Sequence, residues 1–349
     1  GHGTLGPLPT TTTTTSTTST TSTLPPCTDL SAEPCPATSE GEAITERTND
    51  NLQSAVQVSI GSRFQGTVGN ADADGGDFDC FKYGATGGDH LKLTVSKRAG
   101  GTFQPGGIIR RNNAGDYLRA SRPGSADTSI ATRELYIPES GEYFIFVTDL
   151  LNVDGATQFV GGSTFTYRAE LSRVTRAATI VTPPIVDRPG SVPSTGEITF
   201  LGFTAPMGTT ITASTRATQL PTPSKVDTVL LLFDASTTPP TLLASHDDLD
   251  FQAGNTDSAL GVGAPTNGPY LLVVDHFGVG GTAADDRKWD VSLAAQVTEC
   301  LPGATRACYD GPNGTDGVGV CHAGAEPCSR VGAWAGPCTD QVVPPVESV

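Results

Sequence analysis

Two groups of oxygen-bearing side chains carry most of the chemistry in this sequence, because calcium binds about six to eight oxygen ligands. The first group comprises Glu46, Asn49, Asp50, Asp72, Asp74, Asp77 and Asp79. The second, weaker group comprises Asp247, Asp248, Asp250 and Asp257. The run ADADGGDFD lacks the glutamate that closes an EF-hand loop. We expect calcium as the cofactor; the alternative is a set of solvated acidic turns, where Asp and Gly are natural.

The sequence pattern contains no catalytic constellation. The five histidines are His2, His90, His246, His276 and His322. They form no HExxH or similar metal-ligating pair, and there is no GxSxG nucleophile motif. Asp275 and His276 are adjacent, so on a strand they point to opposite faces, which does not suit a charge relay. We therefore predict no catalytic residues and no enzymatic activity.

Charge and composition exclude further classes of protein. The chain has 349 residues, with 21 basic against 37 acidic side chains and a net charge of −16. Such a chain is repelled by phosphate backbones, so we expect no nucleic-acid partner. No apolar run approaches the length of a membrane span. The 41 Gly and 26 Pro argue against a helix-rich fold.

Short runs rich in Val, Ile, Thr, Tyr and Phe alternate with Gly, Asp and Pro clusters, a pattern typical of β-strands. Their order repeats along the chain. The stretch from Asp127 through Gly141-Glu142-Tyr143 to Asp149 matches the stretch from Asp257 through Gly268-Pro269-Tyr270 to Asp275. We predict an all-β protein with two tandem jelly-roll-like β-sandwiches, over residues 44–174 and 175–297.

Residues 1–26 are predicted to form an extended arm, followed by an acidic link over 27–43. Residues 10–23 contain eleven Thr and three Ser, so they cannot form a core. The arm is either a flexible spacer, an O-glycosylated stalk, or an extended strand that adds to the sheet edge of another subunit. The candidate glycosylation sites are Thr10, Thr11, Thr12, Thr13, Thr14, Thr15, Thr17, Thr18, Thr20, Thr21 and Thr23. The start at Gly1-His2 fits either removal of a signal peptide or a cloning remnant.

Eight cysteines predict a disulfide framework made in an oxidising compartment, and therefore an extracellular or cell-surface protein. They are Cys27, Cys35, Cys80, Cys300, Cys308, Cys321, Cys328 and Cys338. Five of them lie in residues 298–349, which have few apolar residues. We predict that this tail is a small module stapled by disulfides.

The two predicted sandwiches resemble bacterial pre-peptidase C-terminal domains. The motifs are ERTNDN (46–51), DFDCFKY (77–83), GDHL (88–91) and GEY (141–143) in the first copy, and DTVLLLFD (227–234) with Asp247-Asp248 in the second. The second copy lacks the opening Asn-Asp element and the D-x-D strand. The resemblance implies a jelly-roll-like β-sandwich of secreted or surface proteins. In relatives attached to collagenases this domain binds calcium, which implies ligands at Glu46, Asn49, Asp50, Asp77 and Asp79.

Residues 298–349 resemble a Cys-rich module of myxobacteria and related bacteria, with one cysteine fewer. Cys27 and Cys35 can pair with each other, which leaves Cys80 for the fifth cysteine of the tail. Phe81 and Tyr83 share the core face of one strand, so we expect Cys80 to face outward. A disulfide from Cys80 to the tail, within one subunit or between two, is therefore a hypothesis.

These observations predict a non-enzymatic extracellular structural protein. It would be a surface or appendage subunit, of a filament or tube, that assembles with copies of itself through β-strand addition, disulfides and calcium. The alternative is a secreted, tethered binding or adhesion module for collagen-like protein or polysaccharide. That alternative needs an exposed aromatic platform. Its candidates are Tyr117, Tyr136, Phe159, Tyr270, Phe277 and Trp289.

Overall fold

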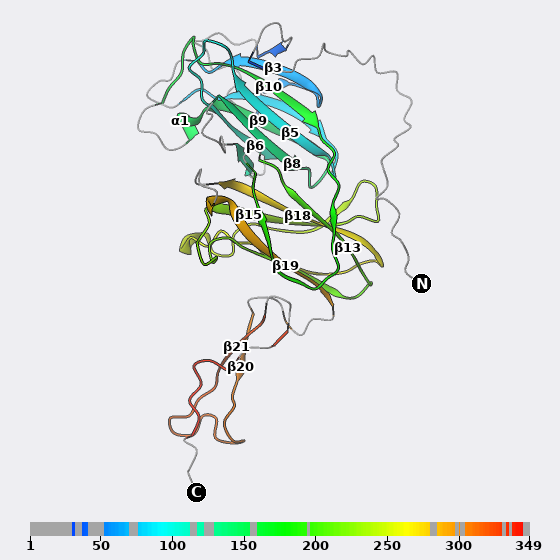
Figure 1. Ribbon diagram of the computed structural model, residues 1–349, viewed down its shortest axis with the longest axis vertical. Helices are drawn as coiled ribbons and strands as arrows, with labels where there is room; N and C mark the ends of the chain where they lie inside the picture. Colours follow the sequence, from blue (N-terminus) through cyan, green and yellow to red (C-terminus); the bar gives the residue numbers. More distant parts are fainter. Residues whose placement is uncertain are drawn as a thin grey trace.

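The protein is seen here as a computed structural model, in which strands form almost all of the regular structure (Figure 1). The described residues are 30–31, 37–40, 52–69, 76–111, 117–121, 129–153, 159–193, 196–279, 285–296, 300, 304–329, 333–334 and 337–344. The predicted all-β fold is confirmed. The Thr/Ser-rich tract with its candidate glycosylation sites lies outside the described residues, as do Cys27 and Cys35.

The first sandwich, sandwich 1, contains two sheets. Sheet A has the strand order β1-β3-β10-β5-β8, and sheet B has the order β2-β4-β9-β6-β7. The strands are β1 Thr38–Ser39, β2 Val56–Gln57, β3 Ser62–Thr67, β4 Asp79–Ala85, β5 His90–Lys97, β6 Pro105–Arg111, β7 Tyr117–Ser121, β8 Ile130–Tyr136, β9 Gly141–Asp149 and β10 Thr166–Arg173, with the short helix α1 Leu150–Val153 after β9. Because β1 pairs with β3, the segment predicted as an acidic link contributes a strand to this sandwich.

The second sandwich, sandwich 2, follows without a long linker. Sheet D has the order β11-β13-β18-β15-β16, and sheet E has the order β12-β19-β14-β17. The elements are β11 Thr179–Ile180, β12 Ile185–Ser191, β13 Thr199–Ala205, β14 Thr210–Arg216, β15 Val226–Asp234, β16 Thr241–His246, the 3-10 helix η2 Phe251–Ala253, β17 Ala259–Gly263, β18 Gly268–Val279, the 3-10 helix η3 Asp285–Arg287 and β19 Lys288–Gln296.

The two sandwiches have the same strand order. Strands β2 to β10 correspond one to one, and in sequence, to β11 to β19. Each sandwich also has a tyrosine that anchors the turn before its own strand. The Tyr143 hydroxyl donates to the carbonyl oxygen of Glu139 at 2.6 Å, and the Tyr270 hydroxyl donates to that of Thr266 at 2.7 Å. This tyrosine-corner geometry fixes the entry to the central strands β9 and β18.

Alternation of apolar and polar residues explains the strands of sandwich 1. In β5, Leu91, Leu93 and Val95 enter the core, while Lys92 and Thr94 face away from it. Strand β15 differs, because its residues 229–233 are apolar without interruption and buried on both faces. Leu230 and Leu232 join the core of sandwich 2, whereas Val229, Leu231 and Phe233 join a second apolar cluster.

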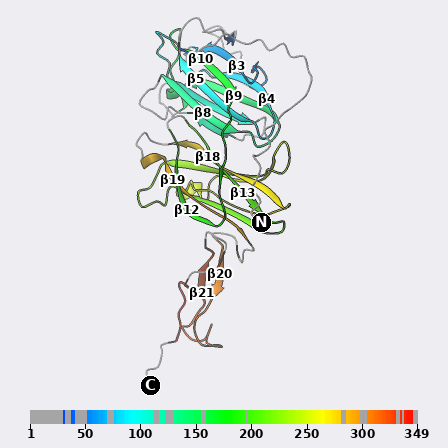
Figure 2. The same cartoon turned by 45° about the vertical axis from the view of Figure 1, so that its right-hand side comes forward.

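That second cluster is the junction between the sandwiches. Tyr136 of β8 packs edge-on against Phe200 of β13 and Phe233 of β15, with ring centroids 5.4 and 5.0 Å apart. His90 of β5 adds a further edge contact to Phe200 at 4.9 Å. Sandwich 1 thus covers the face of sheet D that the core of sandwich 2 leaves open, as the views in Figures 1 and 2 agree.

A buried ion pair crosses the same junction. Arg133 Nη2 of β8 lies 2.7 Å from Asp275 Oδ1 of β18, and the two side chains are 2% and 0% exposed. Arg133 also contacts the ring and the carbonyl oxygen of the next residue, His276. Two strands more than a hundred residues apart are therefore held by a charge pair that water does not reach.

Glu134 forms a second polar link at the junction. Its carboxylate accepts from His90 Nε2 at 3.1 Å and from Arg176 Nη2 at 2.7 Å. Arg176 lies in the segment between the sandwiches, where it also pairs with Glu197 at 3.1 Å. Gly196 fits beside this network because a Cβ there would collide with the carbonyl oxygen of Thr132.

The C-terminal tail is a two-stranded hairpin, β20 Thr305–Cys308 with β21 Gly324–Pro327. Disulfides join Cys300 to Cys328 and Cys308 to Cys338. The tail projects from sandwich 2 on the side away from sandwich 1 (Figure 1). Its described residues bury little apolar surface, so the disulfides are what hold it together.

Replacing Arg133 by Ala should destabilise the protein by about 3–5 kcal/mol, because the change leaves Asp275 buried without its counter-charge. Urea denaturation measures the loss. The matched control is Arg173→Ala, which removes an arginine of sandwich 1 whose side chain is 59% exposed beside Asp89. Exposed pairs of this kind are worth less than about 1 kcal/mol. Equal effects of the two substitutions would contradict a buried ionic link.

The junction should also weaken in acid. Burial alone would raise the pKa of Glu134, but the hydrogen bonds and charges of His90 and Arg176 outweigh it and lower the pKa from 4.5 to about 2. A lowered carboxylate pKa stabilises the fold above the unfolded value and ceases to do so as the pH falls toward 2. About 3 kcal/mol is at stake, at 1.36 kcal/mol per pKa unit.

Urea midpoints between about pH 2 and pH 6 test this dependence. The wild-type protein should lose stability through that range more steeply than Glu134→Gln does. Glu139→Gln, at an exposed position, serves as the control and should follow the wild-type curve. Parallel curves for the wild-type protein and Glu134→Gln would contradict the assignment.

Candidate functional site

The predicted ligands Asp77 and Asp79 lie at the start of β4, and both are buried, at 1% and 0% exposure. Asp79 shares its strand face with Phe81 and Tyr83, which belong to the core of sandwich 1. The carboxylates therefore point between the two sheets at one end of the sandwich. Burying ionised carboxylates there is costly unless a positive charge compensates them.

Asp77 is only partly satisfied by its surroundings. Its Oδ2 accepts from the backbone nitrogen of Gly69, and its carbonyl oxygen accepts from the Thr148 hydroxyl at 2.6 Å. Its Oδ1 is buried and has no hydrogen-bond partner. Among the described residues, no ion pair joins Asp77. An orphaned carboxylate oxygen of this kind fits a cation ligand.

A third carboxylate, which the sequence did not single out, approaches the same end of the sandwich. Glu40, directly after β1, accepts from the Thr67 backbone nitrogen at 2.8 Å and from the Tyr167 hydroxyl at 3.3 Å. Burial raises the pKa of Tyr167 well above its ordinary value, and the charges of Asp79 and Glu40 raise it further. Tyr167 therefore stays a neutral donor shared by two carboxylates.

The other members of the first predicted group, Glu46, Asn49, Asp50, Asp72 and Asp74, lie outside the described residues. The described donors are all oxygens, and one of them is unsatisfied, so this part of the site fits a hard cation such as calcium. Asp77 and Asp79 would hold the ion from β4. Its charge would offset the two carboxylates that point into the end of the core.

The corresponding place in sandwich 2 is different, because its carboxylate is 35% exposed and paired. When the tyrosine corners align the two sandwiches, Asp77 corresponds to Glu197. Glu197 pairs with Arg176, so a guanidinium of the chain itself balances that carboxylate. This agrees with the missing D-x-D strand in the second copy, and within the described residues it leaves Asp77 without the counter-charge that Glu197 has.

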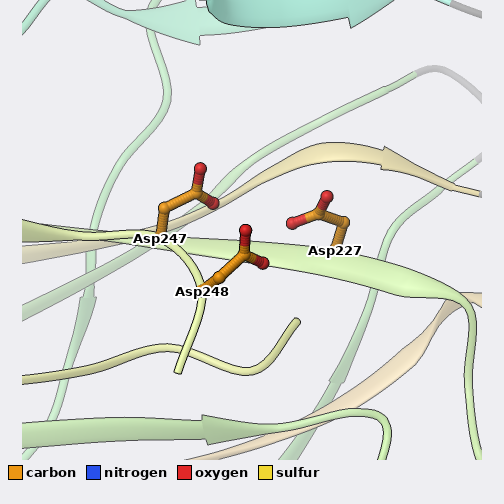
Figure 3. A group of neighbouring side chains, drawn as sticks. All are labelled: Asp227, Asp247 and Asp248. Carbon is orange, nitrogen blue, oxygen red and sulfur yellow. The ribbon is translucent and has the colours of Figure 1, made fainter. Parts of the chain in front are cut away.

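The weaker predicted group in sandwich 2 is divided by the fold. Asp247 and Asp248, just after β16, meet Asp227 of β15, and one oxygen of each lies within 4.8 Å of the others (Figure 3). Asp227 is twenty residues earlier in the chain, so the spacing did not reveal it. Asp247 is exposed, so solvent can screen part of this cluster, although Asp248 Oδ1 is buried without a hydrogen-bond partner. We place the calcium prediction in sandwich 1, where Asp77 and Asp79 are both fully buried.

Asp250 and Asp257, the other two members of the predicted group, do not lie in that cluster. Asp257 is fully buried and accepts from the backbone nitrogens of Ala217 and Thr218, at 2.6 and 3.0 Å, so it holds a turn. Asp250 accepts from the Ala253 backbone nitrogen at 3.0 Å and caps η2. Both side chains are used by local structure.

The described histidines all have structural contacts. His90 faces Glu134, and His276 faces Arg133 across the junction. His246 Nδ1 accepts from the Ala259 backbone nitrogen at 3.3 Å, and His322 is an exposed residue of the tail. None of these contacts places a hydroxyl or thiol nucleophile beside a histidine in the described part of the chain.

The aromatic platform required by the alternative function is mostly buried. Tyr136, Tyr270 and Trp289 are 8%, 1% and 4% exposed and belong to the apolar clusters. Phe277 packs against the junction. Phe159 is exposed, at 38%, and the side chain of Tyr117 lies outside the description. Within the described residues one exposed ring remains, which does not form a platform.

The hypothesis of a disulfide from Cys80 to the tail is wrong for a link within one subunit, and a link between two subunits stays a prediction. Cys80 does lie on the face of β4 opposite the core, but Ala55 and Phe144 cover that face and leave Cys80 0% exposed. Four tail cysteines pair among themselves. The fifth, Cys321, is in neither disulfide and is partly exposed.

No family model and no curated protein matches the sequence. Among solved structures, the chain is similar to the pre-peptidase C-terminal domain of a collagenase from Bacillus anthracis, with 12% identity over 34% of this chain and 93% of that one and a TM-score of 0.25. It is also similar to PliG of Aeromonas hydrophila, a periplasmic inhibitor of g-type lysozyme (14% identity; 34% and 100% of the chains; TM-score 0.19). A third is a protein from Eubacterium rectale described as secreted (11% identity; 74% and 85%; TM-score 0.24). TM-scores this low carry no argument about function.

If calcium binds sandwich 1, then adding calcium should raise the melting temperature and a chelator should reverse the rise. At a calcium concentration about 100 times Kd the stabilisation is about 2.7 kcal/mol. Asp79→Asn should abolish the rise, because the substitution removes a buried anionic ligand. Differential scanning calorimetry measures the change in melting temperature, and titration calorimetry measures calcium binding by the wild-type protein and by Asp79→Asn.

Two controls separate this site from general acidity. Asp316→Asn removes one exposed carboxylate of the tail and should leave the calcium response unchanged. Asp247→Asn with Asp248→Asn removes two carboxylates of the sandwich 2 cluster and should also leave it unchanged. A calcium response that survives Asp79→Asn but disappears in the double variant would contradict the assignment to sandwich 1.

Proposed function

We propose that this chain is an extracellular, non-catalytic structural protein whose two sandwiches form one stiff spacer and which assembles with copies of itself into a surface appendage. The observation that carries the proposal is the junction between the sandwiches. The aromatic contacts of Tyr136 and the buried pair Arg133–Asp275 join the two units across an apolar layer.

Such a junction favours a mechanical role. Domains of one chain move relative to each other by default, unless their interface is large and apolar. Here the covered face of sheet D is apolar along three strands, β13, β15 and β18, and would be exposed if the sandwiches separated. Opening would also leave Arg133 and Asp275 without each other. A hinge-closing enzyme needs the opposite, a junction that opens at low cost.

The tail supports an extracellular location. Disulfides persist in oxidising compartments, and the tail has two of them over fewer than fifty residues. None of the described helices is long or apolar enough to cross a membrane. The histidines also support a non-catalytic role, since His90, His246 and His276 contact strands or turns of the fold.

Assembly is the finer part of the proposal. Strand β1 shows that the N-terminal segment of this chain can add to a sheet edge, because Thr38–Ser39 pairs in parallel with β3. Strand addition uses backbone hydrogen bonds, so it tolerates the Thr-rich sequence that precedes this segment. Calcium bound by Asp77 and Asp79 would stabilise the end of sandwich 1 where Glu40, directly after β1, makes its hydrogen bonds.

Electron microscopy and light scattering of the purified chain test the proposal. Full-length protein with calcium should form filaments or tubes, and a variant that lacks residues 1–40 should remain monomeric. The matched control replaces residues 10–23 with a Gly/Ser run of the same length and so separates chain length from the β-branched sequence. Full-length protein that stays monomeric and binds insoluble collagen or polysaccharide instead would overturn the structural role in favour of a binding module.

A further inference from the structure

The described part of the N-terminal segment, residues 30–31 and 37–40, lies against sheet A of sandwich 1, and we call it the strap. Its β1 residues pair in parallel with Phe64–Gln65 of β3. The Glu40 backbone nitrogen extends the pairing by donating to the Gln65 carbonyl oxygen at 3.0 Å. Nearer the N-terminus, the Ser31 carbonyl oxygen accepts from the Ala99 nitrogen at 3.2 Å, beyond the end of β5.

Arg168 of β10 is the strap's contact in the middle of the sheet. Its neighbours Tyr167 and Ala169 enter the core, so Arg168 faces the other way, yet it is 2% exposed. Its Nη1 donates to the Leu30 carbonyl oxygen at 3.2 Å, and its Nε and Nη2 donate to Gln65 Oε1 at 3.3 and 3.2 Å. The arginine therefore joins the strap to β3 and β10.

Glu40 is the strap's side-chain anchor. It accepts from the Thr67 nitrogen and the Tyr167 hydroxyl, and its carboxylate occupies the space above Gly66, where a Cβ would collide with it. All the other contacts of the strap given above use its backbone nitrogens and carbonyl oxygens. The place that holds the strap, which we call the seat, therefore combines the edge of β3 with the hydrogen-bond partners of Glu40, the Thr67 nitrogen and the Tyr167 hydroxyl.

We propose that the strap is exchanged between copies, so that the seat on sheet A of one copy holds the strap of the next. The proposal rests on the proposed function and names the contact by which assembly occurs. Because the copies are identical, the strap of a neighbour makes every contact described above, and exchange leaves the local bonding unchanged.

The sequence around the strap suits exchange. Residues 41–51 connect the strap to the rest of sandwich 1, and these eleven residues reach about 36–40 Å when extended. N-terminal to residue 30, Pro25 and Pro26 follow the Thr-rich tract, a composition typical of extended spacers. This composition and the length of the connection favour reaching outward over folding back.

A split disulfide tests the exchange. Ser39 and Gln65 are direct partners in the parallel β1–β3 pairing. One copy carries Ser39→Cys, and a second copy, enlarged by a tag, carries Gln65→Cys, both in a Cys321→Ser background that removes the tail thiol. The two copies are refolded together, oxidised and run on a non-reducing gel. Exchange predicts a covalent pair of one small and one tagged chain.

Each outcome decides between the two proposals. If the single variants give no covalent pair, while one chain carrying both substitutions closes a disulfide within itself, the strap stays on its own copy and the exchange is wrong. Filaments seen by microscopy in that case would leave the proposed function standing. If the full-length chain forms neither filaments nor covalent pairs, both proposals fail.

Substitutions of Glu40 test the anchor without new cysteines in the strap. Because own and exchanged straps make the same contacts, Glu40→Ala, which removes both acceptors, should lower the fraction of chains with a docked strap about tenfold, measured as faster proteolytic cleavage of the strap, whereas Glu40→Gln keeps an acceptor and should lower it less. Tyr167→Phe keeps the buried ring and removes one donor, so it should act in the same direction as Glu40→Ala. An unchanged fraction of docked straps in all three variants would show that Glu40 is not the anchor.

Discussion

The constraint on which the rest of the structure depends is that sheet D is apolar on both faces. One face builds the core of sandwich 2, and the other, with Phe200, Val229 and Phe233, has to be covered by something else. Sandwich 1 covers it through Tyr136, and the buried Arg133–Asp275 pair fixes how it sits. Burial of the apolar layer supplies the favourable free energy of the junction. The ion pair fixes the relative orientation of the sandwiches, because misalignment would leave two buried charges uncompensated. We therefore infer that the two sandwiches do not move independently and that they act as one rigid unit.

The same chemistry explains how two copies of one topology come to differ. Where Glu197 of sandwich 2 meets Arg176, the corresponding Asp77 of sandwich 1 has an unsatisfied buried oxygen. In sandwich 2 the counter-charge is Arg176, which also pairs with Glu134 at the junction. In sandwich 1 the carboxylates lie toward the N-terminal segment, where the Tyr167 hydroxyl links them to Glu40. If a cation binds at the end of sandwich 1 where β4 begins, as we propose, it and the N-terminal segment would influence each other there.

Much of the fold was predictable from the sequence, because its signals are local. The alternation in LKLTV and the matched GEY and GPY turns predicted strands and a repeat that the structure shows as β5, β9 and β18. The unbroken run VLLLF indicates a strand that is buried on both faces, because such strands lose the alternation of apolar and polar residues.

The candidate site was harder to predict. Glu40 reaches the sandwich 1 site, and Asp227 reaches the separate Asp247–Asp248 cluster of sandwich 2, through strand pairing that no spacing rule expresses. Asp250 and Asp257 instead accept hydrogen bonds from nearby turns. Cys80 was placed on the correct face, but nothing nearby indicated that Ala55 and Phe144 would cover that face.

The central claim is that the sandwiches form one stiff unit, and a distance distribution between them tests it most directly. Spin labels at Ser59 of sandwich 1 and Thr222 of sandwich 2, both exposed, can be introduced in a Cys321→Ser background and measured by pulsed electron resonance. The account predicts a single narrow distribution whose width does not change when high salt screens exposed charges, since the junction is buried. A broad distribution, or two populations in exchange, would show that the sandwiches move independently and would contradict the account.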